Sequence, residues 1–236
     1  MRTELQPAGF EIYSVAMDTG GADAARKWVE RADVDFPVVV DVEHRLGALF
    51  GVANVPSGIW VDEAGVIVRP PETAYPARPV FVDLDLDDPA VTARFTAAEI
   101  TRFRVVTPLT ARMRIDPETY VAALRDWVAH GSASRYALPP EEVLSRSRPR
   151  PVQEAQAAAA FELGQHLHRR GDKLGAVQWF RESHRLQPDN WTYRRQAWSL
   201  VDPRQGPTAE YDSDWASEVR RTGPENYYAP LQMDPP

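Results

Sequence analysis

The absence of cysteine from the 236 residues is the first limit on the chemistry that this chain can perform. Thiolate nucleophiles, disulfides and sulfur-ligated metals are therefore excluded for these residues. Imidazole is the next candidate. His166 and His168 stand two apart on a predicted helix and so point to different faces, whereas helical zinc ligands are spaced three or four apart. His44 and His184 have no companion at ligand spacing, so we predict no metal site and no cofactor.

Clustered carboxylates suggest a second possible chemistry, calcium binding by Asp83, Asp85, Asp87 and Asp88. This acidic run lacks the central glycine and the terminal glutamate of an EF-hand loop. Residues 80–86 fit better as an edge strand whose charges oppose pairing with another edge. Neither a Gly-rich phosphate loop nor the pattern of a serine-nucleophile elbow occurs in the sequence. The acidic run therefore predicts a charged edge strand, not a cation site.

The charge balance argues against a general nucleic-acid binder, because the net charge is −7 and the sequence pI is about 5.3. Phosphate neutralisation needs clustered Lys and Arg. No apolar run approaches the roughly 20 residues that span a bilayer, and residues 1–10 lack the apolar core of a signal peptide. The absence of cysteine fits a reducing compartment. We therefore expect a cytoplasmic protein without nucleic-acid or membrane partners.

The first half of the chain is predicted to alternate strands and helices. Residues 10–17 are mostly apolar and β-branched, which favours a strand buried on both faces, as in a parallel sheet. Apolar spacing and turn signals predict the remaining elements, which are a helix (22–32), a strand (36–41), a helix (42–50), a β-hairpin (59–62 with 66–69) and a helix (117–130). This alternation predicts an α/β fold.

The order of these elements resembles the thioredoxin-fold redoxins of the TlpA, ResA and peroxiredoxin-like group. The resemblance rests on Trp28, on Phe36 and Pro37 before the valine-rich strand, on the loop 54–57 and on the stretch 60–69. In that family the residue matching Pro56 is a cis-proline, and its loop binds extended substrates by strand-like pairing. The resemblance therefore implies a peptide-binding loop formed by Asn54, Val55, Pro56 and Ser57. The alternative is that Pro56 simply begins a strand.

The catalytic segment of that family has no counterpart in this sequence. In the redoxins a strand, a Cys-X-X-Cys turn and a long helix precede the strand that matches residues 10–17, and residues 1–9 resemble only the end of that helix. The missing strand would lie between the strands at 10–17 and 59–62, which leaves backbone groups unpaired. Three explanations stay open: the chain is part of a longer protein, which we rank first, a partner donates the strand, or the sheet rearranges.

The second half resembles a tetratricopeptide repeat, a hairpin of two helices. Small residues let the two helices approach closely, larger apolar residues fill their interface, a glycine makes the turn and a proline follows the second helix. The matching residues are Leu163, Gly164, Leu167, Gly171, Ala176, Phe180 and Pro188. Residues 191–200 resemble a capping helix. The aromatic residues Trp179, Trp191, Tyr193 and Trp198 are predicted to be core rather than a peptide groove.

Composition divides the chain into four parts. Residues 1–131 form the thioredoxin-like segment, and residues 132–151, rich in Ser, Pro and Arg, are predicted to be a linker. Residues 152–200 form the helical hairpin. Residues 201–236 form a polar, aromatic tail that is expected to lie against the body or to be partly disordered. A solitary repeat needs a neighbour to bury its face, so we expect the hairpin to dock on the first segment.

Two functions stay open from the sequence. In the first, the chain is a redox-inactive module that binds a protein or peptide through the loop at Pro56 and through the helical hairpin. In the second, it belongs to a longer thiol–disulfide oxidoreductase or peroxiredoxin-like enzyme whose cysteines lie upstream of Met1. Enzymatic activity is therefore open, but no catalytic residue is predicted within these 236 residues.

Overall fold

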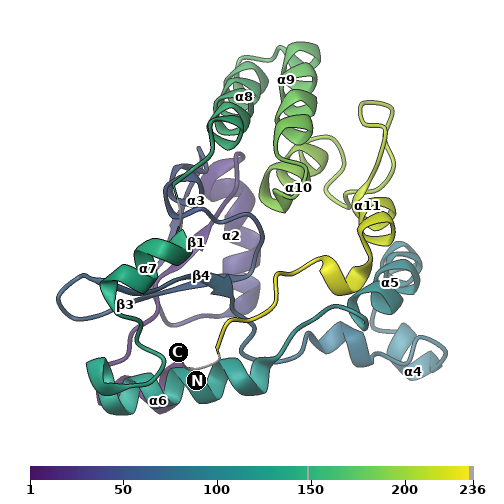
Figure 1. Ribbon diagram of the computed structural model, residues 1–236. Helices are drawn as coiled ribbons and strands as arrows, with labels where there is room; N and C mark the ends of the chain where they lie inside the picture. Colours follow the sequence, from purple (N-terminus) through teal and green to yellow (C-terminus); the bar gives the residue numbers. More distant parts are fainter. Residues whose placement is uncertain (148, 234–236) are drawn as a thin grey trace.

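The computed structural model describes residues 1–147 and 149–233, which form a largely helical α/β structure (Figure 1). Its strands are β1 (Ser14–Ala16), β2 (Val38–Val40), β3 (Ser57–Val61) and β4 (Ile67–Thr73). Its α-helices are α1 (Arg2–Leu5), α2 (Gly21–Ala32), α3 (Arg45–Phe50), α4 (Pro89–Thr92), α5 (Ala97–Thr110), α6 (Pro117–His130), α7 (Pro140–Ser147), α8 (Val152–Arg169), α9 (Lys173–Leu186), α10 (Trp191–Ser199) and α11 (Trp215–Thr222). Short 3-10 helices are η1 (Gln6–Ala8), η2 (Val80–Asp83), η3 (Gly131–Ala133) and η4 (Pro224–Asn226). The predicted α/β class is confirmed at this level.

The strands form two separate sheets rather than one. β1 pairs with β2 in parallel, with Val15 opposite Val39. β3 pairs with β4 in antiparallel, with Gly58 opposite Glu72. In the described part of the chain no strand joins the two pairs. The incomplete single sheet expected from the redoxin resemblance is therefore divided into two.

The turn between β3 and β4 shows why this hairpin forms where the sequence predicts it. The side-chain oxygen Oδ1 of Asp62 accepts hydrogen bonds from the backbone N–H groups of Ala64 (3.0 Å) and Val66 (2.8 Å). Gly65 takes a φ of 78°, a left-handed conformation that glycine adopts without steric cost. Local turn chemistry thus fixes the register of the two strands.

The helical hairpin of α8 and α9 stands at the top of the molecule in Figure 1, above α3 and β1. Gly171 makes the turn with a φ of 88°, and the Asp172 carboxylate caps α9 by accepting a hydrogen bond from the N–H of Gly175 (2.9 Å). At the crossing, an added Cβ on Gly164 would lie 2.7 Å from the Phe180 ring. Two helices thus pack closely here, as predicted, and their identity as a tetratricopeptide repeat stays a proposal.

The signature residues of the hairpin divide into buried and peripheral ones. Ala176 and Phe180 are almost fully buried, and Leu167 packs against the same core. Pro188 is exposed and follows the end of α9. Leu163 is half-buried.

The predicted linker, residues 132–151, contains α7 and contributes side chains to the core, and its residue 148 lies outside the described residues. Tyr136, Leu138 and Val143 are each less than 9% exposed, and the backbone N–H of Leu138 donates to the oxygen of Val68 in β4 (2.9 Å). The few apolar side chains in this Ser- and Pro-rich stretch fall where they can be buried. Composition alone averages over such positions and does not register them.

The predicted edge strand at 80–86 is wrong. This stretch contains the 3-10 helix η2, and its acidic residues make turns instead of strand pairs. Asp85 Oδ1 accepts a hydrogen bond from the N–H of Asp87 (3.0 Å), and Asp88 caps α4 by accepting from the N–H of Ala90 (2.8 Å). Aspartates favour such local bonds to the backbone over strand pairing.

The C-terminal segment lies against the body, the first of the two outcomes expected for the tail. Its helix α11 contributes Val219, and Tyr211, Tyr227 and Tyr228 are buried with the helical hairpin in one apolar core. The described chain then runs back toward the N-terminal residues (Figure 1). There Met233 and Leu5 share a second core with Trp60, Val68, Tyr120 and Leu124. Residues 234–236 of the predicted tail lie outside the described residues.

The aromatic residues of α10 form the centre of the first core, as predicted. Trp191, Tyr193 and Trp198 are at most 5% exposed, and the Tyr193 ring stacks on Phe161 with centroids 4.3 Å apart. Trp179 is the exception, being 40% exposed. A peptide groove made of these aromatic side chains is therefore not formed in this structure.

Replacing Gly164 by alanine tests the close crossing of α8 and α9. The new Cβ would press on the Phe180 ring, so we expect G164A to lower the free energy of unfolding by about 1–3 kcal/mol in chemical denaturation. The exposed Glu162 on the same helix provides the control, and E162A should change stability by less than about 0.5 kcal/mol. A stabilised G164A variant would contradict this packing, since alanine is the better helix former.

Candidate functional site

The loop before β3 has the backbone conformation implied by the redoxin resemblance, because the Val55–Pro56 peptide bond is cis. Asn54 shapes the loop from within. Its Oδ1 accepts a hydrogen bond from the N–H of Val55 (2.9 Å), and its Nδ2 donates to the backbone oxygen of Tyr227 (2.9 Å). Ser57 Oγ donates to the oxygen of Glu72 on the paired strand (3.3 Å). The four predicted loop residues are thus brought together at the start of β3.

The backbone oxygens of this loop are already used within the chain. The oxygen of Ala53 accepts a hydrogen bond from the N–H of Thr192 in α10 (3.2 Å). The oxygen of Val55 accepts one from the hydroxyl of Tyr228 (3.3 Å), and that hydroxyl lies 2.7 Å from the hydroxyl of Tyr75. The C-terminal segment and α10 thus cover this side of the loop. In this structure the loop is a docking point for the chain's own helical half.

A second group of polar side chains joins the two halves at the carboxyl ends of β1 and β2. Gln196 Oε1 accepts hydrogen bonds from the N–H of Thr19 (3.1 Å) and from His44 Nε2 (3.2 Å). Gln165 Nε2 donates to Thr19 Oγ1 (2.7 Å) and to the oxygen of Val42 (3.1 Å). Thr19 follows β1 and His44 follows β2, whereas the glutamines come from α8 and α10. We call Thr19, His44, Gln165 and Gln196 the polar junction.

His44 is the titratable member of the polar junction. It is 2% exposed, and its ring meets the edge of Phe161 at 5.0 Å between centroids. A carbonyl oxygen only accepts, so Nε2 carries the proton toward Gln196. Nδ1 has no hydrogen-bond partner among the described residues. Burial lowers the pKa of His44, which keeps the imidazole neutral at pH 7. The enclosed ring can therefore join the halves but cannot reach a substrate.

The carboxylate of Asp41 positions His44 by starting the next helix. It accepts hydrogen bonds from the N–H groups of Arg45 (2.9 Å), Leu46 (2.8 Å) and Gly47 (3.2 Å). His44 itself takes a left-handed backbone conformation, with a φ of 55°. The first turn of α3 is thus held by an acidic side chain, which favours the positive end of the helix dipole.

Sequence reasoning missed the polar junction, because it tested the histidines only for metal-ligand spacing. A weak signal was present. Gln165 follows Leu163 and Gly164 in α8, and Gln196 precedes Ala197 and Trp198 in α10, so each glutamine borders residues expected in the core, where a polar side chain calls for a partner. Which partner it finds depends on how the helices dock on the first half.

β1 has an edge that no other strand covers in the described chain. The N–H of Ser14 donates to Pro37, and the oxygen of Ala16 accepts from Asp41, so these two residues turn their backbone groups toward β2. Alternate residues of a strand in a parallel pair direct their groups to opposite edges. The N–H and C=O of Val15 therefore face the open edge.

One face of the same sheet is apolar and uncovered. Val15 and Val39 are register partners, which places both side chains on the same face, and they are 41% and 47% exposed. Tyr13, two residues before Val15, is 71% exposed. Leu49 and Phe50 of the neighbouring helix α3 are exposed as well. Parallel sheets are normally covered on both faces, so this surface is unusual. We call Tyr13, Val15, Val39 and the edge of β1 the open face.

A small cavity of about 270 Å³ lies where α9 meets α10. Ala176 and Phe180, two of the repeat-signature residues, line it together with Val177, Leu200 and Tyr211. Its size suits a single side chain better than a cofactor, since small-molecule sites usually span about 300–1,000 Å³.

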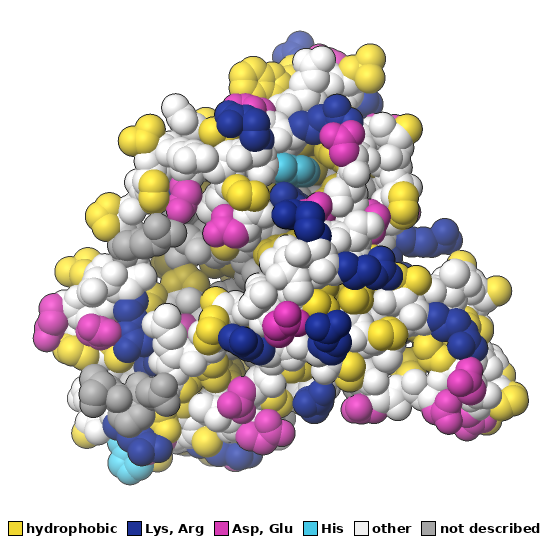
Figure 2. Space-filling view, turned by 45° about the vertical axis from the view of Figure 1, so that its right-hand side comes forward, with side chains coloured by type: hydrophobic (Ala, Val, Ile, Leu, Met, Phe, Trp, Pro, Cys, Tyr) yellow, Lys and Arg dark blue, Asp and Glu magenta, His cyan; other side chains and the backbone are white. Residues whose placement is uncertain are grey.

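In the described residues, no three His, Asp or Glu side chains gather as metal ligands would. On the face drawn in Figure 2, the visible Lys and Arg side chains are interspersed with Asp and Glu. Within residues 1–147 and 149–233, no helix is both long and apolar enough to cross a membrane.

Comparisons with known proteins found no match among protein-family models, curated proteins or solved structures. The resemblances to the redoxins and to the tetratricopeptide repeat therefore rest on the residues quoted above and stay proposals.

The polar junction predicts a loss of stability in mild acid. The folded pKa of His44 lies below the usual 6.5, so the unfolded chain binds the proton first, and stability is full above pH 6.5 and falls below it. Replacing His44 by asparagine, which tolerates a left-handed φ, should reduce the slope of unfolding free energy against pH between 6.5 and 5. The reduction can be at most about 1.4 kcal/mol per pH unit, the slope that belongs to one proton.

His184 adds to the slope of unfolding free energy against pH equally in the wild type and in H44N, because burial lowers its pKa to about 3. The matched control is H166N, since His166 is exposed on α8. Chemical denaturation at closely spaced pH values gives the slopes. Equal slopes for H44N and the wild type would contradict a neutral His44 in the polar junction.

Proposed function

We propose that this chain is a redox-inactive, thioredoxin-like protein-binding module, and that its open face binds an extended segment of a partner protein. The open face carries this proposal, because it combines the backbone groups of Val15, which no other strand of the described chain pairs, with exposed apolar side chains at Tyr13, Val15 and Val39. A partner strand would satisfy the backbone groups and cover the apolar surface in one step.

The energetics favour such a complex. Each new strand hydrogen bond contributes about 0.5–1.5 kcal/mol net, and apolar burial contributes about 25 cal/mol per Å². Soluble proteins usually protect open edges with charges or prolines. Val15 has neither beside it in β1, whose three residues are Ser14, Val15 and Ala16.

The loop at Asn54–Ser57 has a different role in this proposal from the one expected from the sequence. Its oxygens at Ala53 and Val55 are held by α10 and by the C-terminal segment, so partner binding is assigned to the open face. The loop then serves to hold the helical half in place. The helical hairpin contributes through the polar junction, which closes the carboxyl ends of β1 and β2.

A second candidate is a longer thiol–disulfide oxidoreductase or peroxiredoxin-like enzyme whose cysteine-bearing strand and helix precede residue 1. The helical conformation of α1 and η1, which leads directly to the strand β1, favours this candidate. In it, the upstream strand of the same polypeptide would occupy the open face. The DNA before codon 1 separates the candidates: an in-frame strand pattern with Cys-X-X-Cys supports the enzyme, and an immediate stop codon supports the binding module.

Binding at the open face can be measured with a strand peptide that cannot self-assemble. A fluorescent ten-residue peptide of alternating valine and threonine, N-methylated on every second residue, presents one hydrogen-bonding edge only. We expect it to bind the wild-type chain in fluorescence anisotropy and to lose at least about tenfold in affinity for V15K, because a charge on an edge opposes pairing.

The matched control for this measurement is V66K. Val66 is 47% exposed, but it lies in the turn between β3 and β4 and not on the open face. Equal affinities for V15K and V66K, or no binding by the folded wild type, would refute the proposed function.

Redox assays test the sulfur argument directly. The purified chain should neither accelerate insulin reduction by dithiothreitol nor reduce hydrogen peroxide with added thiol, because it contains no cysteine. The control is the same assay with thioredoxin. Turnover above the uncatalysed rate would show that another group carries electrons.

A further inference from the structure

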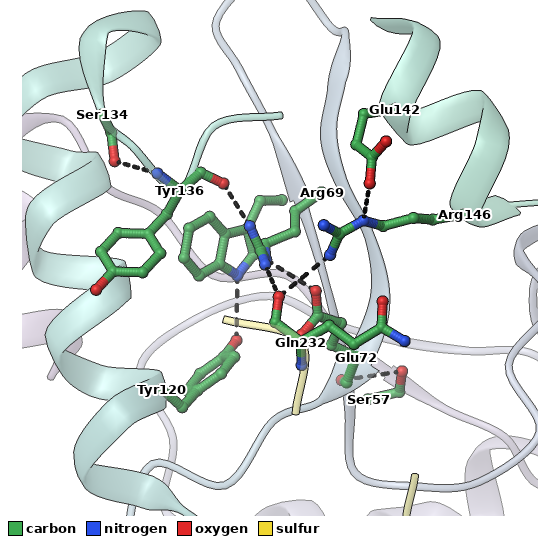
Figure 3. A network of polar contacts seen from close by, with 10 residues as sticks. Ser57, Arg69, Glu72, Tyr120, Ser134, Tyr136, Glu142, Arg146 and Gln232 are labelled. Atoms are coloured by element: carbon green, nitrogen blue, oxygen red, sulfur yellow. Dashed lines mark hydrogen bonds and ion pairs between the residues drawn. The ribbon is translucent and has the colours of Figure 1, made fainter. Parts of the chain in front are cut away.

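In the C-terminal segment, the backbone of Gln232 lies among the charged side chains of Arg69, Glu72 and Arg146 (Figure 3). The N–H of Gln232 donates to Glu72 Oε2 (3.0 Å), and its oxygen accepts hydrogen bonds from Arg69 Nη2 and from Arg146 Nη1 (3.2 Å). Both backbone groups of this one residue are thus bound. No hydrogen bond of the Gln232 side chain is recorded within the described residues, and that side chain is exposed.

Of the charged side chains that bind Gln232, those of Arg69 and Glu72 are largely buried, and that of Arg146 is partly exposed. Arg69 is 1% exposed and forms an ion pair with Glu72 at 2.8 Å. Arg69 Nη1 also donates to the oxygen of Tyr136 (2.6 Å), and Arg146 is held by Glu142 at 2.7 Å. A buried ion pair is favourable only when its remaining polar atoms are satisfied. The backbone of Gln232 supplies some of the hydrogen bonds that these polar atoms need.

Apolar side chains on either side of Gln232 anchor the segment. Met233 is 3% exposed and Leu231 is half-buried, and both pack against the core that contains Trp60, Tyr120 and Leu124. The pattern recognised is therefore an apolar residue, any residue and an apolar residue, in extended conformation. Hydrogen bonds to the backbone of the middle residue do not read its side chain.

We propose that the groove formed by Arg69, Glu72, Arg146 and the adjoining apolar core is a binding site for extended peptides with two apolar residues flanking one free position. In this structure residues 231–233 occupy it as a tethered ligand. This site lies at β4 and is separate from the open face of β1, so it goes beyond the proposed function. Release requires residues 231–233 to detach from Arg69, Glu72, Arg146 and the adjoining apolar core.

The test uses the full-length chain and a labelled peptide with the sequence of residues 226–233. In the wild type the tethered segment competes at an effective concentration in the millimolar range. M233D places a charge in the apolar core and should free the groove. We expect M233D to bind the peptide on the order of 100-fold more tightly than the wild type does in fluorescence anisotropy.

Two controls define the site. Q232S changes only the exposed side chain, so it should bind the peptide as weakly as the wild type does. A peptide with serine in place of its leucine and methionine should not bind M233D. Folded M233D that binds no better than the wild type, or that binds the serine peptide equally well, would overturn the proposal. A dimer of M233D in the absence of peptide would also overturn the proposal, because the chains would then associate through another surface.

Hydrogen exchange decides the matter if M233D fails to fold. In the wild type, the amide of Gln232 should exchange through an opening that leaves the amides of Val68 and Leu124 protected. Exchange of Gln232 only at the rate of global unfolding would show that the segment is a fixed part of the core, and the peptide site would then be rejected.

Discussion

The requirement that buried backbone groups find partners governs this structure more than any single apolar contact. A continuous sheet would satisfy such groups by strand pairing, but here the strands stop at two pairs. Groups from distant segments take over. Gln196 accepts from Thr19, Gln165 donates to Val42, and Asn54 donates to Tyr227. Each of these bonds joins the α/β half to the helical half. The docked helices thus supply hydrogen bonds that a continuous sheet would otherwise provide.

The same constraint separates the surfaces that are closed from the one that is open. At the loop before β3, carbonyl oxygens that could pair with a peptide are bound by Thr192 and Tyr228. At β1 no side chain of the described residues bonds to the backbone of Val15, and Val15 and Val39 are 41% and 47% exposed. Function is therefore proposed at β1, because there the cost of unpaired groups and of apolar exposure can still be removed by a partner.

The charged side chains at β4 must also find hydrogen-bond partners. The side chains of Arg69 and Glu72 are 1% and 9% exposed, and burying their charges is costly unless their polar atoms are satisfied. The backbone of Gln232 and the oxygen of Tyr136 meet part of this need. The two segments that meet there, residues 132–151 and the C-terminal end, are those in which composition indicates a linker and a polar tail. Both are stabilised by a few apolar side chains and by backbone bonds, which a composition average does not register.

The sequence by itself determined the local elements and the absence of sulfur chemistry. The α8–α9 hairpin, the β3–β4 turn and helix α6 follow from apolar spacing, from Gly65 and Gly171 and from capping by Asp116 and Asp172, all of which act within a few residues. Only the tertiary structure decided that the sheet divides, that Gln165 and Gln196 meet at His44, and that the C-terminal segment covers the loop at Pro56. Those outcomes depend on contacts between residues more than 100 positions apart. Local periodicity cannot predict such contacts, because the type of a polar residue does not indicate which distant residue will be its hydrogen-bond partner.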